Sequence, residues 1–118
     1  MRTYKILLIE DNPFVLQVWR AILAQALWSH KLDWATSEKA ATKFLGKSDY
    51  DIIISDFPLT KKTHQEHCSY ILTYTDKAPS IVGSEDQPHY FLQKPLNMAK
   101  GMQLIHQLVT AEENYDAL

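Results

Sequence analysis

The sequence predicts an α/β domain with a mostly parallel sheet, because short apolar runs alternate with segments of helical periodicity. Two of these runs, residues 5–9 and 50–55, are continuous and apolar, and the second holds three consecutive isoleucines. Such runs are typical of strands that are buried on both faces of a parallel sheet. Ligands of these sheets bind outside the carboxyl ends of the strands, so the residues that follow each strand form the candidate site.

Two helices are predicted in the first half of the chain. Asn12 is a favoured N-cap, and Pro13 suits the first helical position. Apolar residues then recur at helical spacing towards an end near residues 28–30: Val15, Val18, Trp19, Ile22 and Ala26. A weak strand signal at residues 32–36 separates this helix from a second one, which begins after Ser37 and stops at Gly46.

The second half of the chain admits two registers for the fourth strand. In the preferred register, residues 63–75 form a helix, residues 80–84 form the fourth strand, and residues 90–93 form the fifth. Parallel crossovers normally need a dozen or more residues, so residues 85–89 would have to be a taut, non-helical strap. In the alternative register, residues 69–75 are the fourth strand and an irregular stretch replaces the next helix. A last helix at residues 97–110 and a flexible acidic tail at residues 111–118 complete the chain.

Length and composition indicate a single domain over residues 1–118. With 46% hydrophobic and 22% charged residues, the chain is able to bury an ordinary core. The net charge of −2 gives no basic field, so we expect no direct nucleic-acid binding. We expect no membrane association either, because no run is long enough to cross a bilayer. A single Cys68 permits a reducing compartment, and a cytoplasmic location is predicted.

Polar residues at the predicted strand ends would meet on one rim of the sheet. Glu10 and Asp11 follow the first strand, Asp56 follows the third, Ser84 ends the fourth and Lys94 follows the fifth. Adjacent carboxylates repel one another, and a hard cation such as Mg²⁺ (or Mn²⁺) removes that conflict. An aspartate oxygen beside such a cation can attack a phosphoryl group while an ammonium neutralises the transferred charge. The pattern therefore favours metal-assisted phosphoryl transfer to Asp56.

These segments resemble the three signatures of response-regulator receiver domains of two-component systems. The resemblance rests on residues 5–13, on the strand that ends at Asp56 and on the Lys94-Pro95 pair, and it spans nearly the whole chain. It implies a flavodoxin-like, doubly wound, five-stranded parallel sheet in the order 2-1-3-4-5, with helix 4 replaced here by a short loop. It also implies a histidine kinase or phosphotransfer protein as the phosphoryl donor and a cis Lys94-Pro95 peptide.

The resemblance gives each matching residue a role. Asp56 matches the phospho-acceptor, Lys94 the signature lysine and Phe91 the switch aromatic residue. The switch hydroxyl matches Ser84 in the preferred register and Thr73 in the alternative one. Four groups match the Mg²⁺ site, the last in its outer shell: Asp11, Asp56, the Pro58 backbone carbonyl and Glu10.

The predicted function is a signalling receiver with, at most, autocatalytic phosphoryl transfer and self-dephosphorylation. The main alternative is a pseudo-receiver, a non-phosphorylated interaction module. Without a fourth helix, sheet area near Tyr90 and Phe91 would lie open, which favours a homodimer through the strand 4 and strand 5 side. A phosphatase with an aspartyl nucleophile is a weaker alternative, because such enzymes carry an acid where Pro58 stands.

Overall fold

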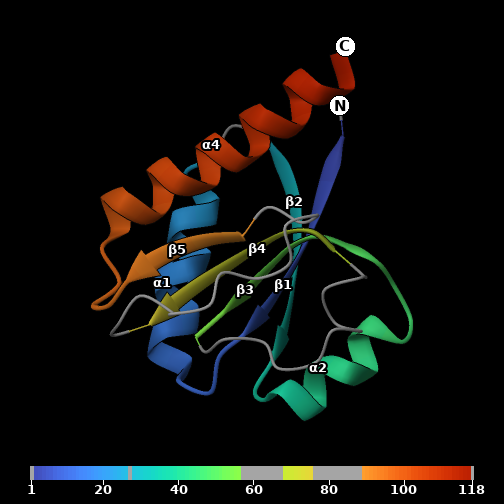
Figure 1. The fold of residues 1–118 in the computed structure, drawn as a ribbon. Helices are drawn as coiled ribbons and strands as arrows, with labels where there is room; N and C mark the ends of the chain where they lie inside the picture. Colours follow the sequence, from blue (N-terminus) through green and yellow to red (C-terminus); the bar gives the residue numbers. More distant parts are fainter. Residues whose placement is uncertain (1, 27, 57–67, 76–88, 118) are drawn as a thin grey trace.

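Within the described part of the chain, five strands form one sheet in the order β2-β1-β3-β4-β5, and every neighbouring pair is parallel (Figure 1). The strands are β1 (Thr3–Ile9), β2 (Ser29–Ala35), β3 (Tyr50–Ser55), β4 (Cys68–Thr75) and β5 (His89–Gln93). The computed structural model describes residues 2–26, 28–56, 68–75 and 89–117. The predicted α/β fold class and strand order are confirmed.

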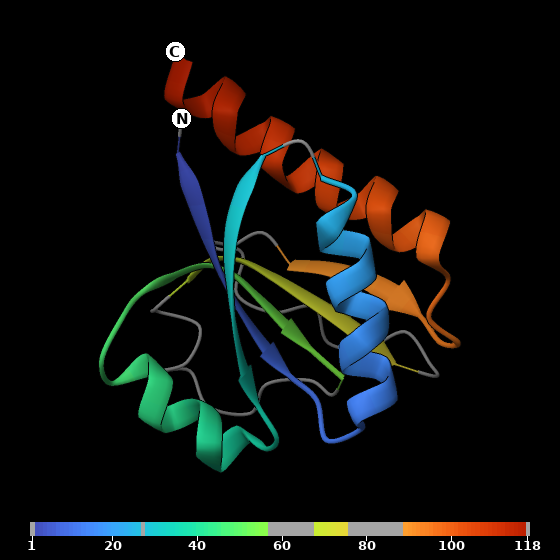
Figure 2. The same cartoon turned by 180° about the vertical axis from the view of Figure 1, so that it is seen from behind.

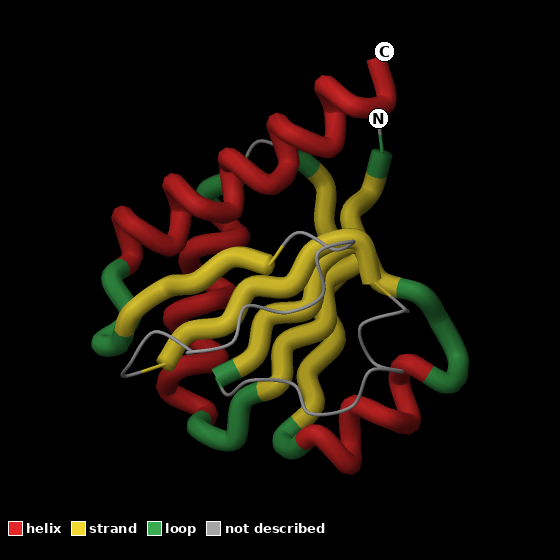
Figure 3. The backbone as a smooth tube through the Cα atoms, viewed as in Figure 1, coloured by secondary structure: helices red, strands yellow, loops and turns green. Residues whose placement is uncertain are grey.

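The described helices lie on both faces of the sheet (Figures 2 and 3). Helices α1 (Pro13–Ala24) and α4 (Met98–Ala117) cover one face, and α2 (Glu38–Leu45) covers the other. Helix α4 approaches α1 closely at Gly101, where an added Cβ would lie 2.8 Å from Ile22 Cδ1. In the part of the chain that the structure describes, no helix is long and apolar enough to cross a membrane.

Alternation along the strands divides the core into two layers. Side chains of Ile6, Leu8, Ile52 and Ile54 pack with α1 and α4, and the intervening Leu7, Ile9 and Ile53 pack with α2. Successive strand side chains point to opposite faces, so a residue two positions beyond a core residue stays on the same face. This parity decides which residues at the strand ends share a face.

The two N-terminal helices begin at the predicted caps. Asn12 Oδ1 accepts the Phe14 N–H at 2.9 Å, and Pro13 is the first residue of α1. Helix α1 ends at Ala24, before the predicted end near residues 28–30, because β2 already begins at Ser29 and the chain must turn before it. Helix α2 lies between Ser37 and Gly46, as predicted.

Removal of the Ser37 cap should weaken α2. Ser37 Oγ accepts the Ala40 N–H at 3.0 Å and satisfies a helix-terminal donor. We expect Ser37→Ala to lower the free energy of unfolding by about 1 kcal/mol. Urea denaturation measures this loss, and Ser37→Asp, which keeps a capping oxygen, serves as the control. Equal stability of the alanine and aspartate variants would contradict the cap's contribution.

The preferred register for the fourth strand is wrong, and the alternative is correct. Residues 68–75, predicted as part of a helix, form β4, which pairs with β3 so that Ser55 lies beside Thr73. The predicted strand at residues 80–84, with Ser84, lies outside the described residues. So does the helix 4 replacement loop, apart from His89, which begins β5. Residues 76–88 now separate β4 from β5, which satisfies the usual length of a parallel crossover.

The last helix is longer than predicted. It begins at Met98, where Asn97 Oδ1 accepts the Lys100 N–H at 3.1 Å, and it ends at Ala117. Residues 111–117, predicted as a flexible tail, therefore belong to α4. Alanine and glutamate at residues 111–113 are strong helix formers, and neither glycine nor proline interrupts the segment.

Candidate functional site

Near the carboxyl ends of four strands, a polar residue lies on the sheet face that α1 and α4 cover. Each lies two positions after a residue of the α1/α4 core layer, namely Leu8, Ile54, Leu72 or Leu92. The four are Glu10, Asp56, Tyr74 and Lys94. They line one pocket of about 320 Å³ at the carboxyl end of the sheet, together with Asp11, Asn12, Val15, Pro95 and Leu96. The predicted convergence of acids and an ammonium at this rim is observed.

Three carboxylates gather in this pocket. Glu10, Asp11 and Asp56 each offer an oxygen, and these oxygens lie within 4.8 Å of one another. Glu10 is buried, Asp56 is half-buried and Asp11 is exposed, so the cluster opens to solvent on one side. Hard oxygen donors with room for water are the ligand set that Mg²⁺ prefers, and these residues therefore fit such a cation.

Glu10 is held by contacts from three elements. Its Oε1 accepts the Tyr74 hydroxyl at 2.7 Å, and its Oε2 accepts the Asn12 N–H at 3.3 Å. Its backbone carbonyl accepts the Trp34 indole N–H at 2.6 Å. Burial raises the pKa of Glu10, and hydrogen bonding to Asp56 raises it further, whereas Tyr74 and Asn12 act in the opposite direction. When no cation is bound, the Glu10 carboxylate therefore takes up a proton at a higher pH than an ordinary glutamate does.

Glu10→Gln should therefore stabilise the metal-free protein at neutral pH. The pKa of Glu10 in the folded protein lies above its usual 4.5, so the protonated carboxyl contributes stability that is lost as the pH rises through the raised pKa. A neutral amide keeps an oxygen for the Tyr74 hydroxyl and avoids the buried charge, and it gives up the longer 3.3 Å bond from the Asn12 N–H. We expect about 1 kcal/mol more stability at neutral pH, with the difference shrinking as the pH falls towards 4.5. Urea denaturation in EDTA at several pH values measures this, and a less stable glutamine variant at neutral pH would contradict it.

Lys94 reaches the pocket from the end of β5. Its peptide bond to Pro95 is cis, as the resemblance implied. Its Nζ lies 5.5 Å from the centre of the Tyr74 ring, and its side chain is half-buried. The ammonium and the carboxylates therefore share one cavity, although they come from opposite halves of the chain.

The remaining predicted residues divide into two groups. Pro58 and Ser84 lie outside the described residues. Phe91 and Thr73 lie in β5 and β4, one position away from Leu92 and Leu72. By alternation they therefore belong to the α2 face of the sheet, away from Asp56. Thr73 is consequently not placed to act as the switch hydroxyl.

Sequence reasoning missed Tyr74. In the register observed, Ser55 pairs with Thr73, so Asp56, the first residue after β3, and Tyr74 of β4 each come one position later. The preferred register placed Tyr74 in a helix, where its proximity to Asp56 could not be seen. The alternative register could have identified it, because Tyr74 directly follows Thr73 in the fourth strand of that register.

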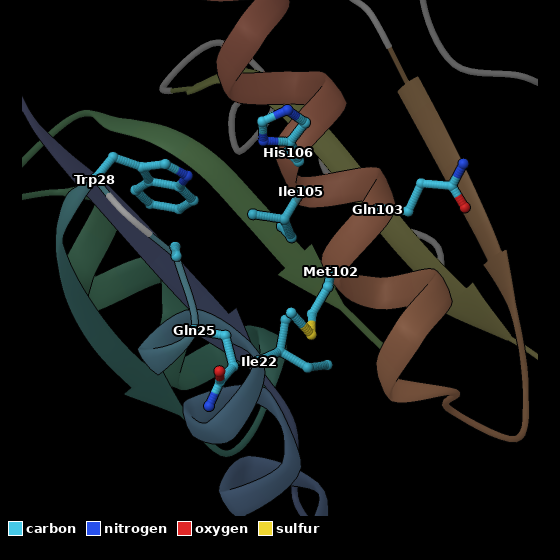
Figure 4. Close-up of a pocket in the computed structure, with 8 residues that line it drawn as sticks. Ile22, Gln25, Trp28, Met102, Gln103, Ile105 and His106 are labelled. Atoms are coloured by element: carbon cyan, nitrogen blue, oxygen red, sulfur yellow. The ribbon is translucent and has the colours of Figure 1, made fainter.

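A second pocket lies between α1 and α4 (Figure 4). It measures about 390 Å³ and is lined by Ile22, Gln25, Ala26, Trp28, Met102, Gln103, Ile105 and His106. Among the residues that the structure describes, this lining is mostly apolar and supplies no carboxylate. Although larger than the acidic pocket, it lacks the ligands for a hard cation, and we therefore place the chemistry in the acidic pocket.

Comparison with known proteins establishes the fold. No family model matches the chain, and no curated protein matches it. A response regulator receiver domain protein from Bacillus halodurans C-125 is similar, with 18% identity and a TM-score of 0.72 over 91% of this chain and 97% of that one. The signal receiver domain of a protein described as a Luxo repressor, from Vibrio parahaemolyticus, shows 16% identity and a TM-score of 0.64 over 98% of this chain and 97% of that one. The chain therefore has the receiver-domain fold, as the sequence resemblance predicted.

Proposed function

We propose that this protein is a two-component receiver that accepts a phosphoryl group on Asp56 in a Mg²⁺-dependent reaction. The observation that carries the proposal is the cluster of Glu10, Asp11 and Asp56, whose oxygens lie within 4.8 Å of one another at the carboxyl end of a receiver-fold sheet. The partner is a histidine kinase or a phosphotransfer protein, and the location is the cytoplasm.

Each residue of the acidic cluster has its own role in binding Mg²⁺. Asp11 and Asp56 would hold the cation directly through their carboxylates, and Glu10 would act from the outer shell, because it is buried and already hydrogen-bonded to Tyr74 and Asn12. The Pro58 carbonyl is a further ligand by the resemblance. When bound, Mg²⁺ would supply charge neutralisation to the carboxylates and the phosphoryl oxygens, so that an anionic donor could approach Asp56.

Asp56 acts as the nucleophile of the transfer. A carboxylate oxygen of Asp56 forms a bond to phosphorus while the phosphorus–nitrogen bond of a phosphohistidine breaks, and the departing imidazole takes up a proton. The Lys94 ammonium, in the same pocket, balances charge on the transferred oxygens. Later attack by water releases inorganic phosphate and restores the carboxylate.

Phosphorylation by a small donor tests the proposal. Incubation with phosphoramidate and Mg²⁺ should add one phosphoryl group to the intact protein, detectable by mass spectrometry. The adduct should be absent in EDTA and removed by hydroxylamine, which cleaves acyl phosphates. A folded protein that gains no phosphoryl group at saturating Mg²⁺ would contradict the proposal.

A pseudo-receiver is the second candidate, and Tyr74 is the observation that favours it. The large Tyr74 side chain lies beside Asp56, and its hydroxyl already donates a hydrogen bond to the Glu10 carboxylate. In that role the protein would act as an interaction or dimerisation module through the β4 and β5 side, where Tyr70 and Tyr90 are half-buried with ring centres 6.1 Å apart. Phosphoramidate labelling separates the two functions, because only the receiver gains an acyl phosphate.

A further inference from the structure

We propose that Tyr74 is a positioning residue that holds both Glu10 and Lys94 in place around Asp56. Its hydroxyl orients the acid, and its ring seats the ammonium. The inference rests on the proposed function and concerns how this chain assembles that site with a tyrosine on β4.

The position of Tyr74 follows from the strand register. Ser55 pairs with Thr73, so Tyr74 is the neighbour of Asp56 across β3 and β4. Ile54 and Leu72 lie two residues earlier and pack in the same core layer, so both later residues continue onto that face. Tyr74 is only 1% exposed and lines the acidic pocket. It is therefore a fixed wall of the site.

The Tyr74 hydroxyl restrains the carboxylate of Glu10. It donates to Oε1 at 2.7 Å, while the Asn12 N–H donates to Oε2 at 3.3 Å, so each oxygen has its own donor. Hydrogen bonds to an ionised carboxylate are shorter and stronger than those between neutral groups. Without the hydroxyl, Oε1 loses this donor, and the carboxylate is free to rotate away from the cluster.

The Tyr74 ring restrains Lys94. The ammonium lies 5.5 Å from the ring centre, within the range of a cation–π contact. The ring itself packs on Trp19, a fully buried residue of α1, with centres 5.6 Å apart and planes tilted by 55°. Because the core fixes the ring, the long lysine side chain has a rigid surface to rest on.

Two substitutions separate the hydroxyl from the ring. Tyr74→Phe keeps the ring and removes the hydroxyl, so it should weaken cation binding. We expect about a tenfold rise in the Kd for Mg²⁺, which corresponds to the loss of one hydrogen bond to a charged group. Tyr74→Leu removes both contacts. It should show the same rise in Kd and, in addition, about a fivefold to tenfold slower phosphorylation by phosphoramidate at saturating Mg²⁺.

Tyr50→Phe is the matched control. Tyr50 is also buried, its hydroxyl donates to Asp33 at 2.7 Å, and Lys5 Nζ lies 5.2 Å from its ring. It lies at the amino end of β3, away from the acidic cluster. The control should lose a comparable hydrogen bond and leave both the Kd for Mg²⁺ and the phosphorylation rate unchanged.

The outcomes distinguish this inference from the proposed function. If the parent protein binds Mg²⁺ and gains a phosphoryl group, but Tyr74→Phe leaves the Kd unchanged, the inference fails and the function stands. If the parent protein does neither, both fail. If the variants do not fold, an NMR measurement on the parent protein still tests the inference. The Tyr74 ring should shift the Lys94 Hε proton resonances upfield, and unshifted resonances would contradict the contact between the ring and the ammonium.

Discussion

Asp56→Asn should abolish phosphoryl uptake from phosphoramidate. The amide has nearly the same shape as the carboxylate but is no nucleophile, and it also removes one charge from the cation cluster. The fold should survive, because Asp56 is half-buried and its backbone N–H, which donates to the Ile9 carbonyl at 3.3 Å, is retained. Intact-mass spectrometry with Mg²⁺ present measures the effect, and we expect no detectable acyl phosphate.

Asp51→Asn is the matched control for this loss. Asp51 is also half-buried, but it lies near the start of β3, whereas Asp56 follows the end of that strand. Its Oδ2 accepts the Lys5 N–H at 2.8 Å. The control should be phosphorylated at the parental rate. A hydroxylamine-sensitive adduct on the Asp56→Asn protein would show that another residue is the acceptor.

Trp19→Ala should cause the largest loss of stability, about 3–5 kcal/mol. Trp19 is fully buried between α1 and the sheet, and its removal would leave a cavity beside Tyr74. Because small domains are stable by only about 5–15 kcal/mol, this loss is a large fraction of the total. Urea denaturation followed by circular dichroism measures it.

Phe14→Ala on the same helix is the control for Trp19. Phe14 is 81% exposed, so its truncation removes little buried surface. Its free energy of unfolding should stay within about 0.5 kcal/mol of the parent value. Similar urea midpoints for the two variants would contradict the burial of Trp19 in the core.

The sequence was most informative where a residue pattern favoured a single kind of secondary structure. Residues 50–55 hold consecutive isoleucines, whose β-branched side chains favour an enclosed strand, and β3 has the predicted bounds. Asn12 and Ser37 mark helix starts because each carries a side-chain acceptor just before an apolar repeat. The acids of the site follow from these elements, since parallel strands end at the same edge of a sheet.

The sequence was ambiguous where an enclosed strand imitates a helix. Residues 68–75 are apolar at helical spacing, yet a strand buried on both faces shows no alternation that would distinguish it. The length of the crossover was the better guide, because a five-residue return between parallel strands is barely long enough to cross the sheet. Tyr74 depended on this register, and so its place beside Asp56 could not be predicted independently of it.

Paramagnetic broadening by Mn²⁺ tests most directly whether the three carboxylates form one cation site. At substoichiometric Mn²⁺, amide resonances of residues 10–12 and 56 should broaden first, because their side chains line the cluster. Those of residues 29–31, at the amino end of β2, should stay sharp, and EDTA should reverse the effect. Broadening that is uniform over the protein, or absent near residues 11 and 56, would contradict a cation site at this edge of the sheet.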